Sequence, residues 1–191
     1  MRKMTSFALG LVLSASACIT PALADGHVVK VQKYIDSNIR GWLSSPEIIK
    51  AVDQQNLNHM GLSATDISVL DQRWRKEKLR GGGDLMNSKL ENPLSTFLRG
   101  IKAASGGVIT EIFIMDSKGL NVAQTDPTGD YMQGDEAKWK MTFPKGSSGV
   151  LIDEVEEDGG INISPTSLSV ARPNGYTLGA VTIGINVDAL K

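Results

Sequence analysis

The sequence predicts an α+β fold in which long helices come first and a five-stranded antiparallel sheet follows. Apolar residues recur every three or four positions up to about residue 104, which is the spacing of a helix face. Beyond Val108 they alternate or run continuously, as they do in strands. The predicted strands are joined by turns and loops rather than by helices, which is typical of an antiparallel sheet.

The first 24 residues have the features of a secretory signal peptide. Arg2 and Lys3 supply positive charge, an apolar stretch covers residues 7–19, and Ala-Leu-Ala at residues 22–24 suits a signal peptidase. The apolar stretch is shorter than the roughly 20 residues that span a bilayer, although an uncleaved anchor is the alternative. We therefore expect export to the periplasm and one mature domain of residues 25–191.

Composition narrows the class of function. Cys18 is the single cysteine and lies in the signal peptide, so the mature chain is expected to depend on its core rather than on disulfides. Removal of Arg2 and Lys3 leaves 18 basic residues against 21 acidic ones, a net charge of −3. Nucleic acid is not an expected partner, because it requires a basic face. The chain ends at Lys191 directly after a strand pattern, so we expect no signalling output domain on it.

A long helix is predicted at the start of the mature chain, from about His27 to Leu43. Its apolar stripe consists of Val28, Val31, Ile35, Ile39 and Trp42. The segment Ser44-Ser45-Pro46-Glu47 combines Ser-x-x-Glu spacing with proline in a first turn. The helix is therefore expected to break or kink there and to continue to about Asn58.

Two more helices are predicted before the sheet. One begins near Ser63 and carries Trp74 on its inner side. Three glycines at residues 81–83 then interrupt the pattern, and without a preceding strand or a Lys-Ser/Thr pair they do not indicate a phosphate loop. Asn92-Pro93 opens the last helix, which ends at Ser105-Gly106-Gly107.

Five strands are predicted in the second half of the chain. Residues 108–115 are apolar on both faces except at Thr110 and Glu111, as expected of a central strand. Asp116-Ser117-Lys118-Gly119 suits a type I turn, so residues 121–125 are expected to pair back as a hairpin. The other strands are expected at residues 150–156, 161–171 and 176–188.

The last predicted strand has two unlike faces. Val181, Ile183 and Ile185 line one face, whereas the other carries small residues such as Ala180 and Gly184. Small side chains leave space either for a ligand or for a closely packed helix. We favour close packing, because glycine within a strand commonly marks a close backbone approach.

Few residues suit catalysis. The mature chain has two histidines, His27 and His59, both outside the predicted sheet, and no cysteine. Thiol and Ser-His-Asp nucleophiles and a zinc site are therefore not expected. The acidic run at residues 153–158 is expected to be a solvated strand end, with calcium or a basic partner as the alternative. We predict no enzyme, no bound metal and no cofactor.

A polar loop is expected after the hairpin, and it holds two of the scarce aromatic residues, Tyr131 and Trp139. Loops on a rigid sheet are where binding residues gather. Tyr and Trp each offer an apolar face with one donor, Gln133 can donate and accept, and Lys140 can bind a carboxylate. The alternative is that the two aromatic side chains only plug the open side of the sheet.

The run Asp130-Tyr131-Met132-Gln133-Gly134-Asp135-Glu136-Ala137-Lys138-Trp139 resembles the pocket loop of the Cache family of extracytoplasmic sensor domains, also called PDC or PAS-like domains. The resemblance covers nearly all of the mature chain. It implies a long N-terminal helix packed along a five-stranded antiparallel PAS-like sheet, with a pocket for small organic acids, amino acids or amines. The residues that it leads us to expect at the ligand are Tyr131, Gln133, Trp139, Lys140 and, from the preceding helix, Trp74. Lysines flank Trp139 where amino-acid-binding members often have arginine, so the ligand class stays open.

These features together predict a soluble periplasmic sensor that binds a small molecule and acts with a separate membrane receptor or signalling enzyme. The alternatives are a protein-interaction module without a ligand and, less expected, a hydrolase. Members of the family often dimerise through the long N-terminal helix, which implies a homodimer here. An enclosed space between Trp139 and the last strand would favour ligand binding over interaction alone.

Overall fold

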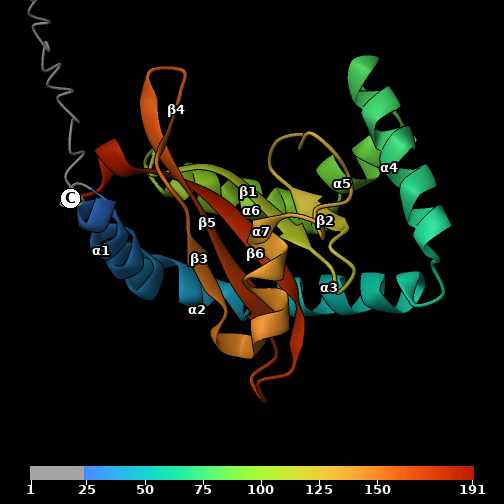
Figure 1. The fold of residues 1–191 in the computed structure, drawn as a ribbon, viewed down its shortest axis with the longest axis horizontal. Coiled ribbons are helices and arrows are strands. Elements are labelled where there is room, and N and C mark those ends of the chain that lie inside the picture. Colours follow the sequence, from blue (N-terminus) through green and yellow to red (C-terminus); the bar gives the residue numbers. More distant parts are fainter. Residues whose placement is uncertain (1–23) are drawn as a thin grey trace, which may run out of the picture.

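A computed structural model describes residues 24–191 and shows an antiparallel sheet with helices on one face and a polar loop with a short helix on the other (Figure 1). The strand order is β2-β1-β6-β5-β3, and β4 also pairs with β5. The predicted α+β class is therefore confirmed. Residues 1–23 of the predicted signal peptide, which was expected to end at residue 24, lie outside the described residues.

Most helices begin and end close to where the sequence predicts them. They are α1 (Ala24–Tyr34), α2 (Arg40–Leu43), α3 (Pro46–His59), α4 (Ala64–Leu79), α5 (Asp84–Leu90), α6 (Pro93–Ala104) and α7 (Ala137–Lys140). A π-helical turn at Ile35–Ile39 joins α1 to α2 without a break, so the predicted long helix is confirmed. None of the helices in residues 24–191 combines the length and hydropathy needed to cross a bilayer.

Helix α5 has no counterpart in the sequence prediction, and α7 lies in what was predicted as loop. The chain reverses at residues 81–83, where a Cβ on Gly83 would collide with the side chain of Glu77. Glu77 comes from α4, is buried, and accepts a hydrogen bond from the amide of Met86 at 2.8 Å. A side chain from the neighbouring helix thus satisfies a backbone donor at the start of α5.

The strands are β1 (Ile109–Met115), β2 (Asn121–Gln124), β3 (Val150–Ile152), β4 (Glu156–Asp158), β5 (Ile161–Ala171) and β6 (Thr177–Asn186). The structure corrects the predicted number from five to six, because the expected strand at residues 150–156 is divided into β3 and β4. Both pair with β5, and Pro165 lies opposite the interval between them. Proline has no amide hydrogen, so the ladder is interrupted where Pro165 only accepts a bond from the amide of Asp153.

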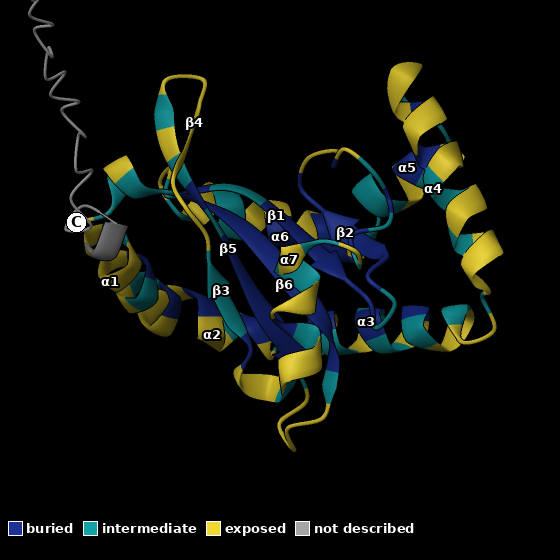
Figure 2. Cartoon of the chain, in the orientation of Figure 1, coloured by how far each residue is buried: buried dark blue, intermediate teal, exposed yellow. Residues whose placement is uncertain are grey.

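The two faces of the sheet pack against different elements. Ile112 and Ile114 of β1 face α1, α3 and α6 in the main core, whereas Phe113 and Met115 face α7. Figure 2 shows the buried strands between these two layers. A further cluster joins α4, α5 and the polar loop through Trp74, Met86, Leu120 and Tyr131.

Close packing, the favoured interpretation of the small residues on β6, is also found. A Cβ on Gly184 would collide with the side chain of Thr110, and one on Gly179 with the carbonyl of Met115. The close neighbour at both glycines is therefore the adjacent strand β1, whereas the packed helix that was expected is found at Ala180, which clusters with Trp139 of α7.

Candidate functional site

The polar loop is fastened to the turn between β1 and β2. Gly119 has a φ of 77°, and its amide donates to the carbonyl of Asp116 at 3.0 Å. The amide of Gln133 then donates to the carbonyl of Gly119 at 2.7 Å, and the amide of Asn121 to the carbonyl of Tyr131 at 3.1 Å. The first half of the loop is thus held beside β2 almost as an additional strand.

Asp116 connects this turn to helix α3. The carboxylate is fully buried, and one of its oxygens accepts from the amides of Lys118 and Leu120 at 2.8 and 2.9 Å. Its other oxygen lies 2.7 Å from His59 Nδ1. His59, at the end of α3, is therefore a partner of a buried carboxylate. The carbonyl of Asp116 accepts from Trp139 Nε1 at 3.1 Å, which links the turn to α7.

Two of the predicted ligand-binding residues, Trp74 and Tyr131, lie in the cluster under α4 and α5. Their rings stack with centroids 5.6 Å apart, and both side chains are buried. Trp74 Nε1 donates to the carbonyl of Thr128 at 3.2 Å. Burial raises the pKa of the Tyr131 phenol. Both residues fix the position of the loop.

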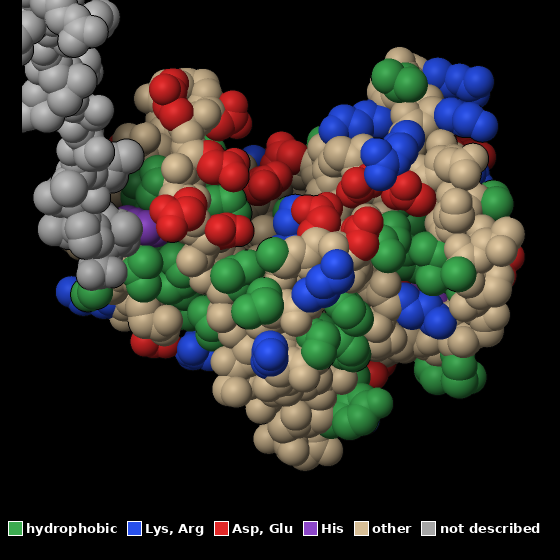
Figure 3. Space-filling view, in the orientation of Figure 1, with side chains coloured by type: hydrophobic (Ala, Val, Ile, Leu, Met, Phe, Trp, Pro, Cys, Tyr) green, Lys and Arg blue, Asp and Glu red, His purple; other side chains and the backbone are tan. Residues whose placement is uncertain are grey.

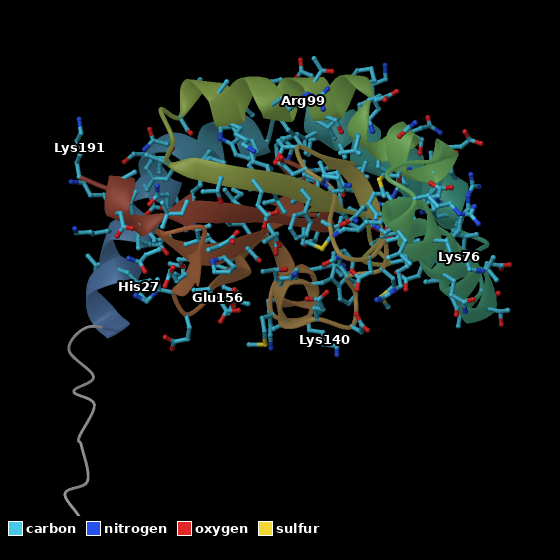
Figure 4. All side chains as sticks on the ribbon, turned by 90° about the horizontal axis from the view of Figure 1, so that it is seen from above. His27, Lys76, Arg99, Lys140, Glu156 and Lys191 are labelled. Carbon is cyan, nitrogen blue, oxygen red and sulfur yellow. The ribbon has the colours of Figure 1, made fainter. Side chains whose placement is uncertain are left out.

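The structure places Trp139 and Lys140 apart from that pair, on α7. The Trp139 ring stacks on Phe143 with centroids 4.9 Å apart and packs on Phe113, Met115 and Ala180. The space between Trp139 and β6 is therefore filled by side chains. Lys140 is exposed and points away from the sheet (Figure 4), and its ammonium donates to the carbonyl of Asp135.

A groove of about 320 Å³ opens beside this cluster, between β1 and the loop. Its charged and amide-bearing walls are formed by Glu111, Asp130, Gln133, Glu136 and Lys138. Phe113 contributes an apolar surface, and residues 127–129 close the rim. Of the five residues predicted at the ligand, Gln133 is the one that lines this groove.

The groove is acidic. Burial raises the pKa of the Glu111 carboxyl, and the Lys138 ammonium offsets this in part. Burial and the carboxylate of Glu136 raise the pKa of Asp130, although Arg75 lies 2.9 Å away. Figure 3 shows Asp and Glu side chains gathered on this face, from the β4–β5 hairpin to the loop. Within residues 24–191 no three His, Cys, Asp or Glu side chains form a metal-binding group.

Internal bonds hold the polar side chains of the groove in place. Gln133 Nε2 donates to the carbonyl of Asp130 at 3.1 Å and also to its carboxylate. Lys138 Nζ lies 2.9 Å from Glu136 and 3.3 Å from Gln133 Oε1, and it sits over the Phe113 ring. Lys138 is the one basic residue lining the groove, and Glu136 already neutralises it.

Sequence reasoning missed Glu111, Asp130, Glu136 and Lys138 as members of one site. Glu111 carried a usable signal, because a carboxylate inside a strand that is otherwise apolar on both faces implies a local polar surface. Asp130, Glu136 and Lys138 lay within the predicted loop, but their spacing in the sequence does not show which groups they meet in the folded groove.

No family model matches this sequence, and no curated protein sequence matches it. The solved structures that are similar in fold include three sensor or ligand-binding domains. The sensor domain of E. coli DcuS has 13% sequence identity over 85% of this chain and 92% of that chain, with a TM-score of 0.48. The sensor domain of the V. cholerae histidine kinase DctB has 9% identity over 88% of this chain, with a TM-score of 0.38. The ligand-binding domain of the Pseudomonas aeruginosa PAO1 amino acid chemoreceptor PctC, in complex with GABA, has 15% identity over 86% of this chain, with a TM-score of 0.38.

The chain spans 57% of the DctB domain and 60% of the PctC domain. These three structures are sensor and ligand-binding domains, the class of protein that the resemblance to Cache domains implies.

Proposed function

We propose that this protein is a periplasmic ligand-binding sensor whose acidic groove takes a small molecule with an ammonium group, either an amine or an amino acid. The charge of the groove supports this most directly. Glu111, Asp130 and Glu136 line the groove together with a single ammonium, that of Lys138, while Arg75 pairs with Asp130 from outside the lining. A bound cation would stabilise the charged forms of Glu111 and Asp130, whose pKa values burial raises.

Each wall has a role in this proposal. Phe113 provides the apolar surface on which an alkyl chain packs, and the amide of Gln133 orients polar groups. Lys138 can receive the carboxylate of an amino acid if it turns from Glu136. The carboxylates of the groove would repel an organic acid that has no ammonium group. Tyr131, Trp74 and Trp139 serve by supporting the loop and the helix that form the walls.

We further propose that the sensor reports to a separate membrane receptor or signalling enzyme. A second candidate, an interaction module without a ligand, is supported by the filled space under Trp139 and by an exposed apolar patch. The patch consists of Leu57, Met60 and Tyr176, which are 64%, 74% and 63% exposed and line one surface hollow. Scattered exposed apolar residues are common, but a contiguous group marks a contact surface more often.

A thermal-shift screen with titration calorimetry tests the ligand proposal. We expect putrescine, γ-aminobutyrate or L-alanine to raise the melting temperature more than succinate does. Glu111→Gln should lower the affinity for the tightest-binding ligand by about tenfold to a hundredfold. This corresponds to the loss of one charge-assisted hydrogen bond, which contributes about 1.5–3 kcal/mol.

The matched control is Glu91→Gln, since Glu91 is exposed and does not line the groove. It should bind as the unchanged protein does. No response to any amine or amino acid at millimolar concentration would reject the groove as a site and favour the interaction module.

A further inference from the structure

Lys89 carries a half-buried ammonium for which the described residues supply no paired carboxylate. It lies on α5, and its Nζ donates to Gln55 Oε1 at 2.8 Å and lies 5.8 Å from the centre of the Tyr131 ring. Across residues 24–191, Lys89 forms no ion pair with Asp or Glu. An ammonium has three donors, so Gln55 uses only one of them.

The carboxylate that attracts Lys89, that of Asp116, already accepts hydrogen bonds from other residues. Asp116 attracts the ammonium, but its own oxygens accept from His59, from Gln55 and from two backbone amides. Burial lowers the pKa of Lys89 in spite of this attraction. A desolvated charge without a counter-ion is unfavourable, and groups of this kind cluster where proteins bind charged ligands.

Lys89 lines a groove of about 590 Å³ between α3, α5 and α6. Its polar side chains include Gln54, Asn58 and Asn92, and its apolar wall is formed by Ala51, Leu94 and Val122. The volume is within the range of small-molecule sites, which combine an apolar wall with a few convergent polar groups. Helices α3 and α6 cover the face of the sheet opposite α7, so this groove and the acidic groove lie on different sides (Figure 1).

Other charges at the groove favour an anion. Lys50 lies at its rim, and Glu47 is the one acidic residue in the lining. The first turn of α6, at Pro93 and Leu94, also lines the groove. The N-terminal end of a helix carries a partial positive charge, which adds to that of the two lysines.

We propose that the groove between α3, α5 and α6 is a second ligand site, which binds a small carboxylate against the ammonium of Lys89. The carboxylate supplies the counter-ion that the described residues lack and takes the free donors of the ammonium. The groove at Lys89 offers this carboxylate positive charge, whereas the acidic groove offers its ligand negative charge. This site does not depend on the proposed amine site, and either can be tested without the other.

Calorimetric titration of the purified protein with succinate tests this site. Lys89→Met keeps most of the aliphatic length and removes the charge, so we expect succinate affinity to fall at least about tenfold, the loss of one charge-assisted contact. Lys76→Met, at an exposed lysine of α4 (Figure 4), should leave the affinity within about twofold.

The neighbouring residue Ser88 gives a second test that keeps Lys89. Ser88 is exposed and lines the groove, so both Ser88→Glu and Ser88→Gln fit the helix. Ser88→Glu should lower the affinity for succinate, because the new carboxylate repels succinate or pairs with Lys89. Ser88→Gln should leave the affinity unchanged. Succinate affinity of the unchanged protein should also decline as the pH rises through the lowered pKa of Lys89, and Lys89→Met should lack this dependence.

Three outcomes would overturn the proposal. One is no heat and no amide chemical-shift change with succinate at millimolar concentration. Another is equal affinity in Lys89→Met and in the unchanged protein. The last is loss of succinate binding in Lys138→Met, which would place succinate at the one ammonium that lines the acidic groove instead.

Discussion

At the scale of single residues, Asp116 joins three separate parts of the chain. Its carboxylate holds the β1–β2 turn through backbone amides and reaches helix α3 at Gln55 and His59. Its carbonyl holds the indole of Trp139 on α7. Buried carboxylates that accept several hydrogen bonds are costly to replace, because the donors that remain lose their acceptor.

We therefore expect Asp116→Asn to lower the free energy of unfolding by about 2–4 kcal/mol. The new amide can replace one oxygen, but it presents a donor to the donors of Gln55 and His59. Urea denaturation measures the loss. Asp126→Asn is the matched control, because Asp126 pairs with Lys102 at the surface and should lose less than about 1 kcal/mol. Equal losses in the two variants would contradict the role of Asp116.

Residue types alone indicated the loop but not the walls of either groove. Tyr131 and Trp139 stood out because aromatic residues are scarce, yet scarcity does not distinguish a ligand contact from a buried support. Glu111 and Lys89 are candidate site residues because burial shifts their pKa values, and this burial depends on elements distant in the sequence. A charged residue in an apolar strand was the available signal, and Lys89 on the unpredicted helix α5 had none.

At the scale of elements, the loop depends on the close approach of two glycines. Gly119 has a positive φ, and a Cβ there would collide with the backbone of Gly134. Neither the turn nor the loop can move aside without breaking the bond from the amide of Gln133 to the carbonyl of Gly119. The same contact orients Gln133 in the acidic groove.

Gly119→Ala should therefore lower the free energy of unfolding by more than about 1 kcal/mol and loosen the loop. Hydrogen exchange followed by mass spectrometry should show faster exchange in residues 127–139. Gly129→Ala, in the same loop, has open space for a Cβ and should change stability by less than about 0.5 kcal/mol. Unchanged exchange in Gly119→Ala would show that the loop is held by other contacts.

Regular elements with strong local signals were predicted well. Strand β5 has the bounds expected from its residues, and α3 begins at Pro46 as the proline predicts. Helix α5 was missed because Glu77 of another helix satisfies its first turn. The division between β3 and β4 was missed because it depends on Pro165 in the partner strand. Both errors come from contacts between segments, which local patterns do not contain.

At the scale of the whole molecule, the sheet separates two grooves of opposite charge. The acidic groove lies with the loop and α7 on one side, and the groove of Lys89 lies among the helices on the other. Asp116 is near both, since it bonds to Gln55, the partner of Lys89, and to Trp139 beside the acidic groove. Ligands at the two sites would therefore act on one hydrogen-bonded network.

The long N-terminal helix carries the remaining prediction, that of a homodimer. Val29 of α1 is 69% exposed and Val28 is 37% exposed, so the helix presents apolar surface to the solvent. In a two-fold dimer each helix meets its own copy, and Val29→Lys would bring two like charges together. We expect sedimentation equilibrium to give a dimer at micromolar concentration for the unchanged protein and a monomer for Val29→Lys. Val69→Lys, at a valine that is 59% exposed on α4, should remain dimeric, and a monomeric unchanged protein would refute the prediction.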